Sequence, residues 1–222
     1  MITEILGVIG LGNAGGAVAG ALASKTKVVG FDPDPERCLR AGDLGVDCVS
    51  STEELAEKTD HIILSLPKPE ISIAVTKTLC DNASRPKLLI ETSTVTPQTA
   101  VTCNDLCKQN DIAYVDAAIA GGVASMAAGE ITFFLGGADE NKKLASNILN
   151  LIAAGIHDLG PVGAGMGTKV VNNGVMHALM VVLIEAFSMS NKLGVSNQTM
   201  IEILNREEGL LRPLVHRVQE RM

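Results

Sequence analysis

The stretch Ile5-Leu6-Gly7-Val8-Ile9-Gly10-Leu11-Gly12-Asn13-Ala14-Gly15 passes from a short apolar run through clustered glycines into small residues. This order predicts a strand, a tight turn and a helix. Gly10 permits the turn, Gly12 lets a pyrophosphate approach the backbone, and Gly15 lets the helix pack closely on the strand. The stretch therefore predicts a Rossmann-type domain whose cofactor contacts come from Gly10, Leu11, Gly12, Asn13, Ala14 and Gly15.

An acidic residue stands where an adenosine ribose would be bound. Residues 27–31 form a second expected strand, and Asp32 follows it, 22 residues after Gly10. The carboxylate would accept hydrogen bonds from ribose hydroxyls and repel a 2′-phosphate, which favours NAD over NADP. Two alternatives stay open: Asp32 also begins a good turn with Pro33, and Arg37 is a nearby cation that would reverse the preference.

Strand-like and helix-like segments then alternate along the chain. Further strands are expected at residues 61–66, 87–90, 112–115, 131–135 and 156–159. This alternation predicts an α/β fold with a doubly wound, mostly parallel sheet. We expect an NAD(P)-binding Rossmann domain at residues 1–164, followed by a long interdomain helix and a short all-α domain for substrate binding and dimerisation at residues 165–222.

A second glycine-rich stretch at residues 163–168 precedes a long apolar helix, expected from Gly167 to about residue 193. Lys169 and Asn173 lie near its start, and their i, i+4 spacing puts both side chains on one face. The helix macrodipole and partial burial would lower the pKa of Lys169, which would let it exchange protons with a substrate hydroxyl. The alternative is a solvated surface lysine.

The composition excludes several classes of function. The net charge of −7, the pI near 5.1 and the scarcity of aromatic residues argue against a nucleic-acid-binding surface. The longest uninterrupted apolar run near the long helix, at 178–184, has seven residues and is too short for a membrane span. The N-terminus lacks a basic signal-peptide region and the cysteines lack metal-binding spacing, so we expect a cytoplasmic protein without a metal site.

Four motifs in this order resemble the β-hydroxyacid dehydrogenase family, which includes 3-hydroxyisobutyrate dehydrogenases and tartronate semialdehyde reductases and is related to 6-phosphogluconate dehydrogenase. The motifs are residues 7–15, Glu91-Thr92-Ser93-Thr94, residues 116–122 and residues 163–173. The resemblance implies an oxidoreductase that transfers a hydride between a nicotinamide cofactor and a small β-hydroxyacid or its aldehyde.

The resemblance also implies roles for single residues. Lys169 would be the general acid/base, and Asn173 would help to hold the substrate. The backbone amides of Gly121 and Gly122 would bind the substrate carboxylate beside Ala120. The residues that would line the cofactor are Leu66, Pro67 and Thr94.

Two departures from the family pattern keep alternatives open. Ala120 stands where relatives usually have serine, which puts the substrate preference in doubt. The second domain looks truncated at Met222, before a Lys-Asp pair that relatives carry. The alternatives are an NAD(P)-binding protein with little turnover and an imine reductase-like enzyme, although Lys169 counts against an imine reductase.

The apolar residues of the long helix spread around its circumference, as in a helix that is buried on several sides. A partner chain is therefore expected to cover it, as in a homodimer or another homo-oligomer. His177 points away from the Lys169 face, and we assign it no catalytic role. Shorter helices are expected from residue 196 or 197 to residue 204 and from about residue 211.

Overall fold

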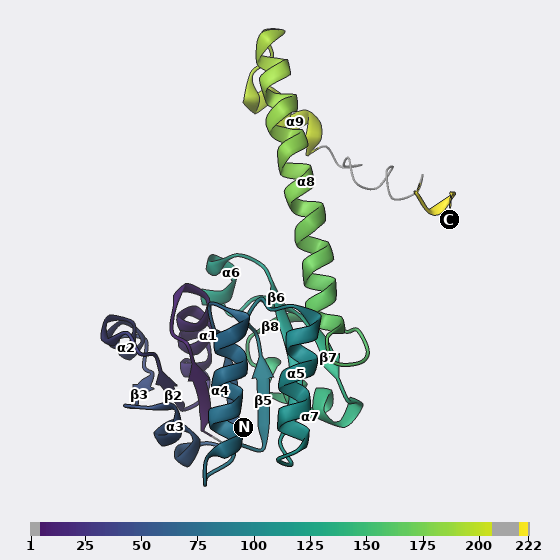
Figure 1. Ribbon diagram of the computed structural model, residues 1–222. Coiled ribbons are helices and arrows are strands. Elements are labelled where there is room, and N and C mark those ends of the chain that lie inside the picture. Colours follow the sequence, from purple (N-terminus) through teal and green to yellow (C-terminus); the bar gives the residue numbers. More distant parts are fainter. Residues whose placement is uncertain (1–4, 206–217, 222) are drawn as a thin grey trace. The chain divides into compact units, whose positions relative to one another are not determined.

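The computed structural model describes residues 5–205 and 218–221, and the chain divides into two compact units, Met1–Val171 and Asn172–Met222 (Figure 1). The first unit contains an eight-stranded sheet in the order β3-β2-β1-β4-β5-β6-β7-β8. Neighbouring strands are parallel except for β6 and β7. This confirms the predicted mostly parallel, doubly wound sheet. The strands are β1 (Leu6–Ile9), β2 (Val28–Phe31), β3 (Asp47–Cys48), β4 (His61–Leu64), β5 (Leu88–Glu91), β6 (Ala113–Ala120), β7 (Ile131–Gly137) and β8 (Ala153–Asp158).

Helices cover both faces of this sheet. Successive residues of a strand point to opposite faces, so Leu6 and Val8 belong to one apolar layer and Ile9 belongs to the other. Figure 1 shows α4 and α5 in front of β5. One layer includes residues of α1 (Asn13–Ala23), α2 (Pro35–Gly42), α6 (Val123–Ala127) and α7 (Asp139–Leu149), and the other includes residues of α3 (Thr52–Lys58), α4 (Pro69–Asp81) and α5 (Pro97–Lys108).

Side-chain caps explain where several helices begin. The Ser51 hydroxyl accepts a hydrogen bond from the backbone N–H of Glu54 (3.1 Å) at the start of α3. Thr96 caps α5 through the N–H of Thr99 (3.1 Å), and Pro97 occupies the first helical position. Each cap satisfies a backbone donor that has no partner within its helix. Ser51 and Thr96 are thus the N-cap residues of α3 and α5.

The second unit is helical where the structure describes it. α8 (Ala164–Lys192) begins in the first unit and continues into the second, where α9 (Asn197–Leu204) follows. Ser196 caps α9 through the N–H of Thr199 (3.1 Å). The unit boundary at residues 171 and 172 falls inside α8. The domain division that we expect at residues 164 and 165 stays a prediction, and the helix expected from about residue 211 begins outside the described residues.

Several predicted boundaries differ from the structure, and two of these differences concern segments of the predicted site. The sequence predicts that β6 ends at residue 115, whereas it continues to Ala120 because residues 115–120 pair with β7. The sequence also predicts that α8 begins at Gly167, whereas it begins three residues earlier, at Ala164. An extra turn forms because Asp116 accepts hydrogen bonds from the backbone at the start of α8. Both differences come from contacts between segments that are distant in the sequence.

Candidate functional site

The loops that carry the predicted cofactor residues follow β1, β2, β4 and β5. These strands are parallel, so their carboxyl ends meet at one edge of the sheet. β1 lies between β2 and β4, and the chain continues outward in opposite directions from these two neighbours. This reversal is the topological switch point at which doubly wound sheets bind dinucleotides.

The glycine turn has the conformation that the sequence predicts. Gly10 has a φ angle of +92°, which residues other than glycine rarely adopt. A Cβ on Gly15 would lie 1.9 Å from the carbonyl oxygen of Gly10, so only glycine lets α1 approach β1 this closely. A Cβ on Gly12 would come no closer than 3.8 Å to a described atom, Nη1 of Arg37. No described side chain caps α1, so its first N–H groups are placed for an anionic group.

The carboxylate of Asp32 is buried and holds three neighbours. Oδ2 accepts hydrogen bonds from the N–H of Leu11 (2.8 Å) and from Nη1 of Arg37 (3.3 Å), while Oδ1 accepts one from the N–H of Asp34 (2.9 Å). Arg37 and Gly12 line a cavity of about 320 Å³ beside the glycine turn. Asp32 therefore supports the turn and lies beside a cation. The sequence leaves two alternatives open, that Asp32 serves only the turn and that Arg37 reverses the preference for NAD over NADP. These contacts are compatible with both.

A hydrogen bond joins the two loops that are predicted to line the nicotinamide. The N–H of Leu66, in the loop after β4, donates to the hydroxyl of Ser93, in the loop after β5 (2.7 Å). Leu66 is partly buried, whereas Pro67 and Thr94 are exposed. The three predicted residues thus lie on two neighbouring loops at the carboxyl edge of the sheet.

The end of β6 presents the predicted substrate segment. Ala120 is the last residue of the strand and pairs with Thr132 of β7. Gly121 follows with φ +138°, and Gly122 is the N-cap residue of the short helix α6. Both glycines are exposed, and a Cβ on Gly122 would meet nothing within 4 Å. The backbone here is open enough for a carboxylate to approach.

Asp116, in the middle of β6, fixes the start of α8. It is fully buried, and its carboxylate accepts hydrogen bonds from the N–H groups of Gly163 (2.8 Å) and Met166 (2.9 Å). Burial raises the pKa of Asp116, and these two backbone hydrogen bonds oppose that rise. A Cβ on Gly165 would lie 2.9 Å from Asp116 Oδ2 and 2.3 Å from the carbonyl oxygen of Phe134. Glycine at 165 therefore makes room for the cap.

Lys169 lies one turn after Met166 on this anchored helix. Its side chain is partly buried, and that burial lowers the pKa of Lys169 below the ordinary value of 10.5. The sequence predicts that Lys169 lies in the first turn of α8, and this is wrong, because Lys169 is the sixth residue of a helix that begins at Ala164. The field of the helix macrodipole fades within the first turn, so burial is the cause of the lowered pKa.

Asn173 and His177, the other two residues of α8 considered for the site, belong to the second unit. Asn173 is four residues after Lys169 in the same helix and is partly buried. His177 is exposed. The substrate role of Asn173 stays a prediction from the resemblance.

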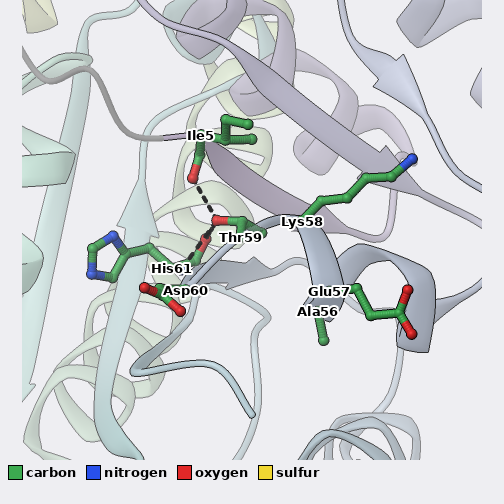
Figure 2. A pocket seen from close by; sticks show the side chains of 7 residues that line it. All are labelled: Ile5, Ala56, Glu57, Lys58, Thr59, Asp60 and His61. Atoms are coloured by element: carbon green, nitrogen blue, oxygen red, sulfur yellow. Dashed lines mark hydrogen bonds between the residues drawn. The ribbon is translucent and has the colours of Figure 1, made fainter. Parts of the chain in front are cut away.

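A different pocket lies where β1 and β4 begin, away from the cofactor loops. Figure 2 shows its lining, with Thr59 between Ile5 and His61. The Thr59 hydroxyl donates hydrogen bonds to the carbonyl oxygens of both residues. This pocket of about 320 Å³ is at the opposite edge of a parallel sheet, so it does not belong to the predicted site. His61 is buried at the start of β4, at this opposite edge of the sheet.

The helix α8 is long and apolar enough to cross a membrane by length and composition. Among the described residues, none in its most apolar window is buried. Core helices of proteins that never meet a membrane pass the same test, so one such helix is a weak indication. The length of the uninterrupted apolar run does not reveal this property, because polar residues such as His177 and Glu185 divide the apolar sequence of the helix into shorter runs.

Sequence reasoning misses two contacts that support the predicted site. The cap that Asp116 provides joins residues 47 and 50 positions apart, and the bond between Leu66 and Ser93 joins residues 27 positions apart. The local signal in the described part of the chain is the cluster of glycines around the start of α8, where Gly165 leaves space for Asp116. The pairing itself requires the strand order of the sheet.

Comparisons with known proteins agree with this architecture. Residues 5–171 match the family model described as the NAD binding domain of 6-phosphogluconate dehydrogenase. The mitochondrial 3-hydroxyisobutyrate dehydrogenase of Homo sapiens is 29% identical over 208 residues, which make up 92% of this chain and 62% of the human protein. The chain therefore spans less than two thirds of that relative's length.

Solved structures show the same likeness. The structure of Mycobacterium tuberculosis 3-hydroxyisobutyrate dehydrogenase with L-serine is 30% identical, has a TM-score of 0.85, and matches over 94% of this chain and 72% of that chain. An imine reductase from Pseudomonas sp. has a TM-score of 0.88 at 18% identity, over 99% of this chain and 77% of that chain. The second likeness shows the fold alone.

Proposed function

The chain belongs to the family that shares the NAD-binding domain of 6-phosphogluconate dehydrogenase and includes the 3-hydroxyisobutyrate dehydrogenases, and from this premise we propose that it is an oxidoreductase acting on a small β-hydroxyacid or its aldehyde. One observation carries the proposal. Lys169, whose pKa is lowered by burial, lies on a helix that Asp116 anchors to β6. The same strand ends at the predicted substrate loop, so the acid/base and the carboxylate site share one rigid support.

The residues at the sheet edge fit a nicotinamide dinucleotide. The open backbone at Gly12 and the uncapped start of α1 would hold the pyrophosphate, and Asp32 would hold the adenosine ribose. Leu66, Pro67 and Thr94 would flank the nicotinamide. The cofactor, when bound, accepts or donates the hydride. We propose NAD as the preferred cofactor because the Asp32 carboxylate would repel a 2′-phosphate.

The proposed role of Lys169 is proton exchange with the substrate oxygen. Its lowered pKa increases the fraction of neutral amine at a given pH, and a neutral amine accepts the hydroxyl proton as the alcohol is oxidised. In the reverse direction the ammonium returns this proton to the carbonyl oxygen. The N–H groups of Gly121 and Gly122 would bind the substrate carboxylate, with Ala120 beside them.

A binding titration followed by a substrate panel tests this function. We expect the purified chain to bind NADH and to oxidise at least one member of a panel of small β-hydroxyacids with NAD, and an imine panel with NADPH should give no turnover. Tight NADH binding without turnover of any hydroxyacid would favour the cofactor-binding protein. Turnover of imines alone would favour the imine reductase.

The cofactor preference gives a separate prediction. Asp32→Ala should raise the KM for NAD and shift the NADP-to-NAD ratio of kcat/KM by about 10-fold or more towards NADP, the size of one charge-assisted hydrogen bond. The reason is that Arg37 loses one of its two carboxylate partners, Asp32, and keeps only Asp34, which leaves more of its positive charge available to a 2′-phosphate. Steady-state kinetics with both cofactors measures the ratio, and Asp43→Ala, at an exposed position after α2, is the control. An unchanged ratio would make Asp32 a turn residue only.

We also propose that a second copy of the chain covers the apolar surface of α8. Size-exclusion chromatography with light scattering should report a homodimer or a larger homo-oligomer, because contiguous apolar surface of this kind marks an interaction site. A monomer at micromolar concentration would contradict this assembly. The large apolar side chains of α8 that are at least half exposed are Val170, Val171, Val175, Met176, Met180, Val181, Val182, Ile184 and Met189, and Leu193, the residue after the helix, is exposed as well.

A further inference from the structure

A buried carboxyl group lies directly behind the two loops that are proposed to line the nicotinamide. Glu91 is the last residue of β5 and is fully buried. Its Oε1 accepts a hydrogen bond from the N–H of Ser93 (2.9 Å), and the hydroxyl of Ser93 accepts one from the N–H of Leu66 (2.7 Å). The hydrogen bonds therefore run from Glu91 to the loop after β4.

Thr92, which lies between Glu91 and Ser93, makes a second connection to β4. Thr92 donates two hydrogen bonds to the carbonyl oxygen of Leu64, one from its N–H (2.8 Å) and one from its hydroxyl (2.7 Å). The segment from Glu91 to Ser93 thus holds both the end of β4 and the loop that follows it. Glu91 is therefore linked to Leu66 by two hydrogen bonds through Ser93, and Thr94 follows Ser93 in the chain.

The second oxygen of the carboxyl group, Oε2, is also buried. Oε2 is near the hydroxyl of Ser72 on α4 but makes no hydrogen bond of standard geometry with any described residue. The titratable groups that face Glu91 are Asp116 and Tyr114 on β6 and Cys103 and Cys107 on α5. Asp116 is its direct neighbour across the two strands. Ionised Glu91 would therefore add a second buried negative charge beside Asp116.

We propose that Glu91 is a positioning residue of the cofactor site, which as a neutral acid holds the loops after β4 and β5 in the arrangement that binds the nicotinamide. The inference rests on the proposed function, because these loops matter for activity only if a nicotinamide cofactor binds there. In this role Glu91 acts through the two loops and does not contact the cofactor or the substrate.

The pH dependence follows from burial. Burial raises the pKa of Glu91 from the ordinary 4.5 to about 7, Asp116 adds to the rise, and the hydrogen bonds from Ser93 and Ser72 oppose it. Above pH 4.5 the unfolded chain loses a proton that the folded chain keeps. Rising pH therefore favours unfolding, and the loss of stability accumulates between about 4.5 and about 7. Cofactor affinity should fall as pH rises through 7, when the folded chain also ionises.

Glu91→Gln separates this role from a merely structural one. The glutamine keeps an acceptor for the Ser93 N–H, can donate to Ser72, and never ionises. Between pH 6 and 8.5 we expect the wild-type Kd for NADH to weaken by about 5-fold or more, the lower end of ordinary coupling between linked sites. The Kd of Glu91→Gln should stay nearly constant over the same range. Glu57→Gln, at an exposed position on α3, should follow the wild type.

Thermal unfolding provides a second readout that does not depend on the cofactor. The Tm of the wild type should fall between pH 5 and 7, and the Tm of Glu91→Gln should fall less. Parallel Kd profiles for wild type and variant, with NADH bound by both, would overturn the inference and leave the proposed function standing. Absence of NADH binding to the wild type at every pH would remove the proposed function and this inference with it.

Discussion

Lys169→Ala should lower kcat for hydroxyacid oxidation by about 10²-fold or more, with the Kd for NADH nearly unchanged. The lysine is proposed to exchange a proton with the substrate oxygen, and its partial burial lowers its pKa towards that task. It lies on α8, outside the glycine turn that is proposed to bind the cofactor. Stopped-flow or steady-state assays with the best substrate of the hydroxyacid panel, together with NADH fluorescence titration, measure both quantities.

Two further variants distinguish between two causes of the lower kcat, the loss of proton exchange and the loss of the positive charge. Lys169→Arg keeps the positive charge, but its guanidinium group stays protonated at any accessible pH and cannot accept the hydroxyl proton. This variant should therefore lose about as much activity as Lys169→Ala. Lys192→Ala, in the last turn of the same helix and exposed, should behave as wild type. In the wild type, kcat for oxidation should rise with pH as the amine of Lys169 loses its proton. Undiminished turnover in Lys169→Ala would remove the lysine from the mechanism.

Local signals in the sequence suffice to predict the fold. The glycine turn at residues 10–15, the caps at Ser51 and Thr96 and the alternation of strands and helices each depend on neighbouring residues. The structure confirms the conformation of Gly10 and the close packing at Gly15. Both could be predicted because a backbone turn of this kind tolerates few residues other than glycine at these positions. Strand β3 is missed, since two residues carry no periodic pattern.

The site is less accessible to sequence reasoning because its supports join distant segments. Glu91 and Asp116 are adjacent only in the sheet, where β5 pairs with β6. Asp116 acts on α8, a helix that begins 48 residues later in the chain. The sequence therefore predicts the motifs that contain these carboxylates but not what the carboxylates hold. It also misplaces Lys169 by a turn, because the cap that starts α8 early comes from another strand.

Asp116→Asn should destabilise the chain and lower kcat together. The asparagine amide has one acceptor and one donor group, so one of the N–H groups of Gly163 and Met166 faces a donor. An unsatisfied buried donor costs about 1–3 kcal/mol of unfolding free energy. If the start of α8 shifts by about 1 Å, the misplacement of Lys169 can cost about 10²-fold in kcat. Urea unfolding and steady-state kinetics measure the two effects, and Asp105→Asn, at an exposed position on α5, is the control.

Gly165→Ala tests the same cap without changing its charge. Alanine normally stabilises a helix relative to glycine by about 0.8–1.0 kcal/mol, and Gly174→Ala in the same helix should do so because a Cβ there meets nothing within 4 Å. At position 165 the Cβ would lie 2.3 Å from the carbonyl oxygen of Phe134 and 2.9 Å from Asp116 Oδ2, so α8 must move away. We expect the opposite sign at this position, a loss of stability accompanied by a loss of kcat. A Gly165→Ala variant as stable and as active as Gly174→Ala would show that the contact between Asp116 and α8 does not position Lys169.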